Sequence, residues 1–155
     1  VVEPVRIGGT VVSSSKVREA IWNGDVRLAS MLLGRPYDME GRVVAGMKRG
    51  KRLGFPTANI ETKGELFPKS GVYAAVIVMK GRKYKAVANV GKHPTFPEDP
   101  FSVEAHIFDF DSDIYGEEVG LLFMDRIRDD TAFPTQEALS EQIEHDALKA
   151  REILK

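Results

Sequence analysis

The sequence predicts an α+β domain that is mainly β, with its strands closing on themselves as a small antiparallel barrel. Helical patterns stand at both ends of the chain, and several short apolar or alternating runs follow one another between them. The composition changes near residues 34–40, where a residue pattern typical of helices is followed by one typical of strands and turns. A length of 155 residues allows one compact domain with its own core and leaves little for a second.

Three helices are expected, two before residue 35 and one at the C-terminus. Ser13 to Ser15 can cap the first helix, which Asn23-Gly24 breaks. Asp25 can cap the second, and Gly34 would end it. Thr135 can cap the last helix, whose apolar face consists of Leu139, Ile143, Ala147, Ala150 and Leu154.

Strands are expected from about Gly41 onward. The run 42–47 is short and β-branched, and 71–79 is longer and apolar. Lys80-Gly81-Arg82 is typical of a hairpin turn into a strand over 83–90. The last two predicted strands cover 101–110, which alternates in polarity, and 119–127.

The composition excludes several classes of chemistry. The formal net charge is −1, so the domain has no strong field for nucleic acid or an acidic membrane, and neither is expected as a partner. There is no cysteine, which excludes disulfides and fits a cytoplasmic protein. The three histidines lack metal-ligand spacing, so no zinc site is expected. No membrane span or signal peptide is expected either.

Glycines and basic residues alternate between residues 46 and 52. Gly46 and Gly50 would let backbone amides approach an anion, and Lys48, Lys51 and Arg52 would supply compensating charge. That combination suits a mobile flap over the phosphates of a nucleotide, although the Walker and dinucleotide motifs are absent. On composition alone, a solvated basic turn is the favoured interpretation.

Pro56 stiffens the segment that follows. It biases its neighbour to an extended conformation, so Thr57 and Asn59 should project from the same side. A hydroxyl and an amide carbonyl are hard oxygen ligands that suit a Mg²⁺ shared with phosphate oxygens. The alternative is that both side chains only satisfy the backbone of a turn.

Glu104 lies in the middle of an alternating strand, on the face with His106 and Phe108 and opposite the face with Val103 and Ala105. It could be a general base that takes a proton from a substrate hydroxyl as that hydroxyl attacks phosphate. It could equally belong to the solvated face of an antiparallel sheet. The sequence alone leaves these two interpretations evenly balanced.

The chain resembles riboflavin kinases through an ordered series of segments from about Gly41 to the C-terminus. The series begins with the basic segment and Gly54-Phe-Pro-Thr-Ala-Asn59. It continues with Gly71-Val-Tyr73, Ala88-Asn-Val-Gly91, Pro94-Thr95, Val103-Glu-Ala-His-Ile107, Asp113-Ile-Tyr-Gly116, Ile127-Arg128, and a last helix with Gln142-Ile143 and Asp146. One such motif would carry little weight, but the full order is not explained by coincidence.

The resemblance implies a six-stranded Greek-key barrel that phosphorylates the ribityl 5′-hydroxyl of riboflavin with ATP, giving FMN and ADP. It makes Glu104 the catalytic base and assigns Mg²⁺ to Thr57 and Asn59. The ATP-binding residues that it implies are Gly46, Lys48, Gly50, Lys51, Arg52, Thr57, Asn59 and Tyr115. The flavin-binding residues are Pro94, Thr95, Arg126 and Arg128.

Residues 1–40 resemble the end of the adenylyltransferase module of bacterial bifunctional FAD synthetases, and residues 41–155 resemble the riboflavin kinase domain. The segment from Val12 to Arg18 matches that module, with Ser14 and Arg18 in place and Ser15 where threonine is usual. The His-x-Gly-His motif of that module is absent, so no FMN adenylylation is expected. The resemblance implies that the kinase domain is covalently continuous with this module in a longer protein. We expect residues 1–40 to form a loosely attached pair of helices.

Two other functions stay open on the residues. One is a non-catalytic β-barrel that binds flavin or a nucleotide, which would need no base at Glu104. The other is RNA binding by the basic turn, which the near-zero net charge does not favour.

Overall fold

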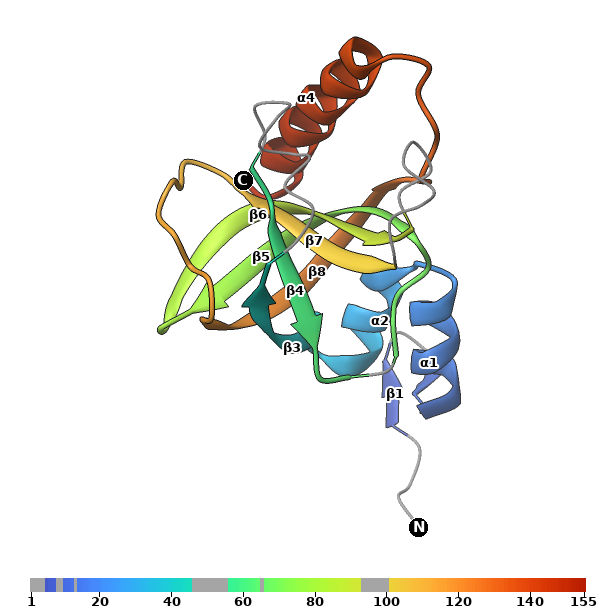
Figure 1. The fold of residues 1–155 in the computed structure, drawn as a ribbon. Helices are drawn as coiled ribbons and strands as arrows, with labels where there is room; N and C mark the ends of the chain where they lie inside the picture. Colours follow the sequence, from blue (N-terminus) through green and yellow to red (C-terminus); the bar gives the residue numbers. More distant parts are fainter. Residues whose placement is uncertain (1–4, 8–9, 13, 46–55, 65, 93–100) are drawn as a thin grey trace.

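The computed structural model describes residues 5–7, 10–12, 14–45, 56–64, 66–92 and 101–155 (Figure 1). Six strands close into an antiparallel barrel in the order β3-β4-β7-β6-β5-β8. Their bounds are β3 Tyr37–Val44, β4 Ala58–Thr62, β5 Gly71–Met79, β6 Arg82–Gly91, β7 Ser102–Ile107 and β8 Glu118–Arg128. β5, β6 and β7 are consecutive neighbours, and β8 returns to pair with β5, which is a Greek-key arrangement. The predicted fold class is confirmed.

Some residues to which the sequence assigns a role lie outside the described part of the chain. They are Gly46, Lys48, Gly50, Lys51 and Arg52 of the basic segment, and Pro94 and Thr95. Their roles stay predictions.

The interior of the barrel is filled by alternate side chains of each strand. Tyr73 and Phe123 are fully buried there and meet edge to face, with ring centroids 5.3 Å apart. Val103, Ala105 and Ile107 also face inward, which confirms the alternation expected for this strand. The opposite side chains of β7, including Glu104, therefore lie on the outer wall of the barrel.

The β5–β6 hairpin forms as the sequence predicts. Met79 pairs with Arg82, so Lys80 and Gly81 make the turn. Both have positive φ angles, 51° and 77°, which match the right-handed twist of the two strands.

The C-terminal helix α4, Gln136–Ile153, covers part of the outer wall (Figure 1). The Oγ1 atom of Thr135 accepts a hydrogen bond from the Ala138 N–H at 3.1 Å, which confirms the predicted cap. Ala150 packs with Val72, Ala74, Val87 and Phe108 in a second core between helix and barrel. This packing closes the outer wall on one side of the polar residues described below.

The two N-terminal helices pack on the barrel. Strands β1, Val5–Ile7, and β2, Thr10–Val12, pair with each other, and helices α1, Ser14–Trp22, and α2, Val26–Leu33, follow. Asp25 caps α2 and Gly34 ends it in a left-handed conformation, as predicted. Ile21 is fully buried, and Val26 belongs to the barrel core. The expectation of a loosely attached helix pair is wrong, because these apolar side chains are buried against the barrel.

Two strands differ from the sequence expectation. The first barrel strand begins at Tyr37 rather than Arg42, so it spans the boundary placed between residues 40 and 41. Strand β4 was not expected and pairs with both β3 and β7. A Cβ on Gly41 would lie 2.5 Å from the carbonyl oxygen of Glu61. The glycine therefore allows β4 to lie this close to β3, because any other residue would collide with the backbone there. Assignment of residues 1–40 to another module stays a prediction.

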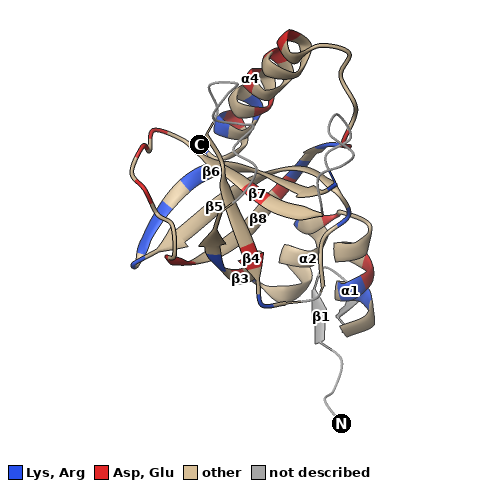
Figure 2. Cartoon of the chain, viewed as in Figure 1, with Lys and Arg blue, Asp and Glu red and all other residues tan. Residues whose placement is uncertain are grey.

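Charges of both signs are distributed around the barrel (Figure 2). Among the helices that the structure describes, none is long and apolar enough to cross a membrane.

Candidate active site

The candidate site is built on a row of polar residues that crosses three neighbouring strands of the outer wall. Glu104 on β7 lies directly opposite Asn59 on β4 and directly opposite Asn89 on β6. Directly opposed residues have Cβ atoms about 5 Å apart, so the three side chains are neighbours on one face. Each of the three is partly buried. The structure thus brings together Asn59 and Glu104, two residues that the sequence singled out 45 positions apart.

The row lies near one end of the barrel. Val44, at the end of β3, pairs with Asn59, and Asn89 lies two residues before the end of β6. Residues 45 and 56, which flank the basic segment, therefore lie at the same end as the row. The segment that the sequence assigns to the nucleotide phosphates, residues 46–52, lies outside the described residues, and only the residues that flank it can be placed at this end.

A contact from His106 holds the chain as it enters β4. The Nδ1 atom of His106 lies 2.8 Å from the carbonyl oxygen of Pro56, the residue before Thr57. His106 is on the same face of β7 as Glu104, so this contact ties the Pro56–Thr57 entry to the outer wall. Thr57 is itself partly buried.

The oxygen atoms of Thr57 and Asn59 are chemically suited to Mg²⁺. A hydroxyl and an amide carbonyl are neutral hard donors, and Glu104 supplies a carboxylate next to Asn59. Within the described ranges, no group of three or more His, Cys, Asp or Glu residues could hold a metal ion. The donors present therefore fit a magnesium ion that takes other ligands from water and phosphate.

Tyr115 lies in the turn that precedes β8 and is 68% exposed. Asp113 Oδ1 accepts a hydrogen bond from the Tyr115 N–H at 2.9 Å, and the next residue, Gly116, donates its N–H to the Val43 carbonyl at 2.9 Å. This places the turn against the end of β3, one residue from Val44, which pairs with Asn59. An exposed aromatic ring at this position can stack on a planar ligand.

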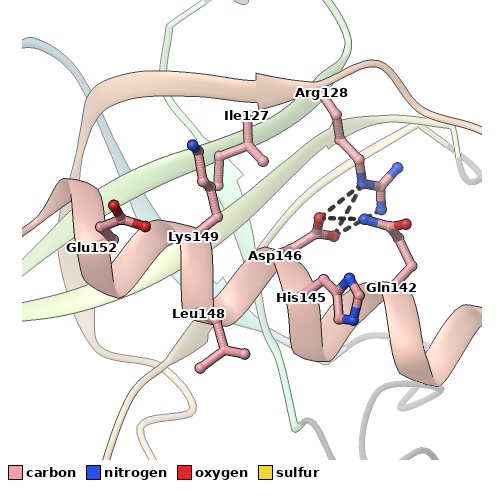
Figure 3. A pocket seen from close by; sticks show the side chains of 8 residues that line it. All are labelled: Ile127, Arg128, Gln142, His145, Asp146, Leu148, Lys149 and Glu152. Atoms are coloured by element: carbon pink, nitrogen blue, oxygen red, sulfur yellow. Dashed lines mark hydrogen bonds and ion pairs between the residues drawn. The ribbon is translucent and has the colours of Figure 1, made fainter.

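Arg128 is engaged with the C-terminal helix (Figure 3). Its Nε atom donates to Asp146 Oδ1 at 2.9 Å and its Nη2 atom to Oδ2 at 2.8 Å, which is a bidentate ion pair. Gln142 donates to the same carboxylate at 3.0 Å, and Arg128 Nη1 donates to the Asp129 carbonyl at 3.0 Å. The Asp146 residue is only 4% exposed, so the helix and β8 are joined by a buried charge pair.

An open groove of about 490 Å³ runs along this side of α4 (Figure 3). Its lining combines apolar and charged side chains: Ile127, Arg128, Gln142, His145, Asp146, Leu148, Lys149 and Glu152. Arg128 pairs with Val72, and Val72 pairs with Asn89, so β5 lies between the groove and the strand that carries Asn89, and Glu104 does not line the groove.

Arg126 lies opposite Tyr73 and points toward the core side of the barrel. Its guanidinium carbon is 5.8 Å from the centre of the Tyr73 ring. The Nη2 atom donates to the Ser70 carbonyl at 2.6 Å and pairs with Asp129 Oδ1 at 2.7 Å. Burial raises the pKa of the Tyr73 hydroxyl, and the hydrogen bond with Arg126 partly opposes that rise.

Asn89 and Asp130 lie in segments that the family resemblance marks, 88–91 and 126–130, but the sequence analysis assigned neither residue a role of its own. Burial raises the pKa of the Asp130 carboxyl, and a hydrogen bond from Asn89 partly opposes the rise. The Oδ2 atom of Asp130 is buried and has no hydrogen-bond partner among the described residues. The Ala88-Asn-Val-Gly91 motif was noticed in the sequence, but only the pairing of β6 with β7 shows that Asn89 adjoins Glu104.

The closed six-stranded antiparallel barrel with a polar row on its outer wall defines the class as a small β-barrel domain. The family model described as "Flavokinase: Riboflavin kinase" matches residues 33–154, and the chain belongs to that family. A bifunctional riboflavin kinase/FMN adenylyltransferase of Bacillus subtilis is 43% identical over 144 residues, covering 90% of this chain and 45% of that protein. The Escherichia coli K12 protein of the same description is 38% identical, with 94% and 47% covered. The chain therefore spans about half the length of these relatives.

Solved structures agree on the fold. A Streptococcus pneumoniae protein described as a macrolide-efflux protein is 40% identical, with a TM-score of 0.87 over 97% of this chain and 50% of that one. Riboflavin kinase from Trypanosoma brucei superposes with a TM-score of 0.53 at 24% identity, covering 77% of this chain and 80% of that one, which shows a shared fold.

Proposed function

We propose that this chain transfers the γ-phosphoryl group of ATP to the ribityl 5′-hydroxyl of riboflavin, producing FMN and ADP. The observation that supports the proposal best is the cross-strand row in which Glu104 lies between Asn59 and Asn89. A carboxylate that neighbours two asparagine side chains on a barrel wall is suited to receive a proton from a bound hydroxyl. Membership of the riboflavin kinase family supplies the substrate class.

In the proposed reaction, Glu104 accepts the proton of the 5′-hydroxyl as that oxygen attacks the γ-phosphorus. A new oxygen–phosphorus bond forms, and the bond between the γ-phosphorus and the β–γ bridging oxygen breaks. ADP leaves with the electron pair of the broken bond, and Glu104 returns its proton to solvent. Removing such a base typically costs ~10²–10⁴-fold in rate.

The nucleotide end of the site would be formed at the end of β3. Thr57 and Asn59 would hold Mg²⁺, which neutralises charge on the transferring phosphoryl group when it is bound. We assign phosphate contacts to Gly46, Lys48, Gly50, Lys51 and Arg52, because this segment follows β3, whose last residue, Val44, pairs with Asn59. The exposed ring of Tyr115 would pack on the nucleotide.

The flavin end would be formed by Arg126, Arg128, Pro94 and Thr95. In the structure, the Nε, Nη1 and Nη2 atoms of Arg128 already donate hydrogen bonds to Asp146 and to the Asp129 carbonyl. We therefore propose that Arg128 shapes this end of the site through its ion pair with α4, and that Arg126 lies nearer the ring system. A cytoplasmic location would give the enzyme access to ATP.

Incubation of the purified chain with riboflavin, ATP and Mg²⁺, followed by separation of the flavins, tests the proposal. FMN should accumulate in proportion to ADP. Tight binding of riboflavin without FMN under any divalent metal would instead identify a flavin-binding module and contradict the kinase assignment.

A further inference from the structure

The turn between α1 and α2 presses against Arg126. A Cβ built on Gly24 would lie 2.8 Å from both Cδ and Nε of Arg126 and 3.2 Å from Cβ of Lys69. Gly24 also has a φ of +77°, a conformation that glycine adopts without strain. The turn therefore fits closely against the Arg126 side chain, because any residue with a Cβ at position 24 would collide with that side chain.

A second glycine packs against the other side of the guanidinium. A Cβ on Gly71 would lie 2.6 Å from Nη2 of Arg126. The Nε atom of Arg126 is buried without a hydrogen-bond partner in the described part of the chain. Packing by Gly24 and Gly71, rather than a complete set of hydrogen bonds, therefore holds the guanidinium in place.

Further contacts connect the helix pair to the same region. Lys69 donates its N–H to the Ile21 carbonyl at 3.1 Å, and the Tyr73 hydroxyl donates to the Lys69 carbonyl. Asp125 pairs with Arg27 of α2 at 2.9 Å through Oδ2 and accepts the Arg126 N–H at 2.9 Å through Oδ1. The side chain and the backbone of Arg126 are thus both fixed by contacts that reach the N-terminal helices.

Arg126 is connected to the polar row through residues 129 and 130. Its Nη2 atom pairs with Asp129 Oδ1 at 2.7 Å, and the next residue, Asp130, lies against the end of β6, where a Cβ on Gly91 would be 3.2 Å from its Oδ2 atom. Asn89 is directly opposite Glu104. A displacement of Arg126 would therefore shift the 129–130 segment and disturb the residue beside the proposed base.

We propose that the α1–α2 turn is a positioning element of the kinase site: Gly24 sets Arg126, and Arg126 sets the 129–130 segment that lies against the end of β6, beside Asn89 and Glu104. The helix pair then contributes to the geometry of the kinase site and does not only pack beside the barrel. This inference rests on the proposed function.

Two glycines of this chain allow a matched test. Gly24 and Gly34 have similar φ angles, +77° and +74°, but a Cβ on Gly34 would meet nothing within 4 Å. Asparagine tolerates this conformation, so Gly24→Asn and Gly34→Asn introduce the same side chain with little backbone strain. Only the first displaces Arg126.

The kcat/KM for riboflavin is measured for both variants at a temperature where both are fully folded. Gly24→Asn should lower it ~10-fold or more, because a misplacement of about 1 Å can cost ~100-fold. Gly34→Asn should leave it unchanged. In an Arg126→Ala background, Gly24→Asn should have no further effect, since the contact that couples the two residues is gone.

Equal kinetic constants for Gly24→Asn and Gly34→Asn would overturn the inference while leaving the kinase assignment intact. Absence of FMN formation by the unmodified chain would instead contradict the proposed function. If Gly24→Asn does not fold, Asp125→Ala decides the question, because it removes the Arg27 pair and the Arg126 N–H contact at a side chain that is 25% exposed. A reduced kcat/KM in folded Asp125→Ala would support the inference, and normal kinetics would overturn it.

Discussion

Asn59 and Glu104 are direct partners across the β4–β7 ladder. The relationship is set by the Greek-key order of the barrel, because β4 pairs with β7 while the chain between them forms β5 and β6. It places a candidate metal ligand next to a candidate base, which is the geometry that a phosphoryl transfer site needs.

Asn59→Ala should weaken binding of Mg-ATP while leaving riboflavin binding intact. The change removes one hard oxygen ligand, and we expect the KM for Mg-ATP to rise ~10-fold, equivalent to about 1.4 kcal/mol. Steady-state kinetics with varied Mg-ATP provide the measurement. Lys63→Ala, an exposed position just past β4, is the control. An unchanged KM for Mg-ATP would remove Asn59 from the nucleotide site.

Asp146→Ala should destabilise the domain strongly. It leaves Arg128, whose side chain is 20% exposed, without its bidentate partner, and breaking a buried pair in this way typically costs ~3–5 kcal/mol. Urea unfolding monitored by circular dichroism gives the free energy of unfolding. Glu144→Ala, at an exposed position on the same helix, should change it by less than about 0.5 kcal/mol. Similar stability of the two variants would show that the pair does not join α4 to the barrel.

The partly buried Asp130 carboxyl should make the free energy of unfolding depend on pH. The direction is opposite to that expected for a carboxylate whose pKa is lowered by folding. Burial raises its pKa in the folded state, so the native state binds more protons than the unfolded state between the ordinary carboxyl range and the raised value. Stability therefore falls as pH rises through that window. Asp130→Asn removes this effect, so its stability relative to the unmodified chain should increase with pH there.

Asp129→Asn is the matched control for this experiment. A hydrogen bond from Arg126 lowers the pKa of the Asp129 carboxyl, so its stabilising effect is present above the ordinary carboxyl range and is lost as pH falls through the lowered value. Asp129→Asn should therefore reduce stability at neutral pH, and the difference from the unmodified chain should shrink in acid. Parallel pH profiles for the two variants would contradict the assigned environments.

Local patterns in the sequence predicted many of the elements. The β5–β6 hairpin follows from an apolar run and the Lys80-Gly81 turn, and the start of α4 follows from Thr135. Strand β4 was missed, because the Ala58–Thr62 run is too short to show a clear alternation after Pro56. The start of β3 was placed late, because polar and glycine residues between Tyr37 and Arg42 obscure its pattern.

The site depended on tertiary information that local patterns lack. Local patterns identified Glu104 and Asn59 as candidates, and the family resemblance favoured their functional interpretation, but their direct pairing follows from strand order. Asn89 and Asp130 received no individual role, although both lie in segments marked by the family resemblance, since an asparagine in a strand and a carboxylate after one are common on solvated surfaces. The burial of Val26 in the barrel core was missed for the same reason, because periodicity shows that a helix has an apolar face but not which surface covers it.

Replacement of Glu104 by glutamine tests the central claim most directly. The change keeps the shape of the side chain and removes its ability to accept the proton. Glu61→Gln, at an exposed position on β4, is the control. Single-turnover formation of FMN should fall ~10²–10⁴-fold in Glu104→Gln, with riboflavin and Mg-ATP still bound and with Glu61→Gln unaffected. Undiminished turnover by Glu104→Gln would contradict the assignment of the base.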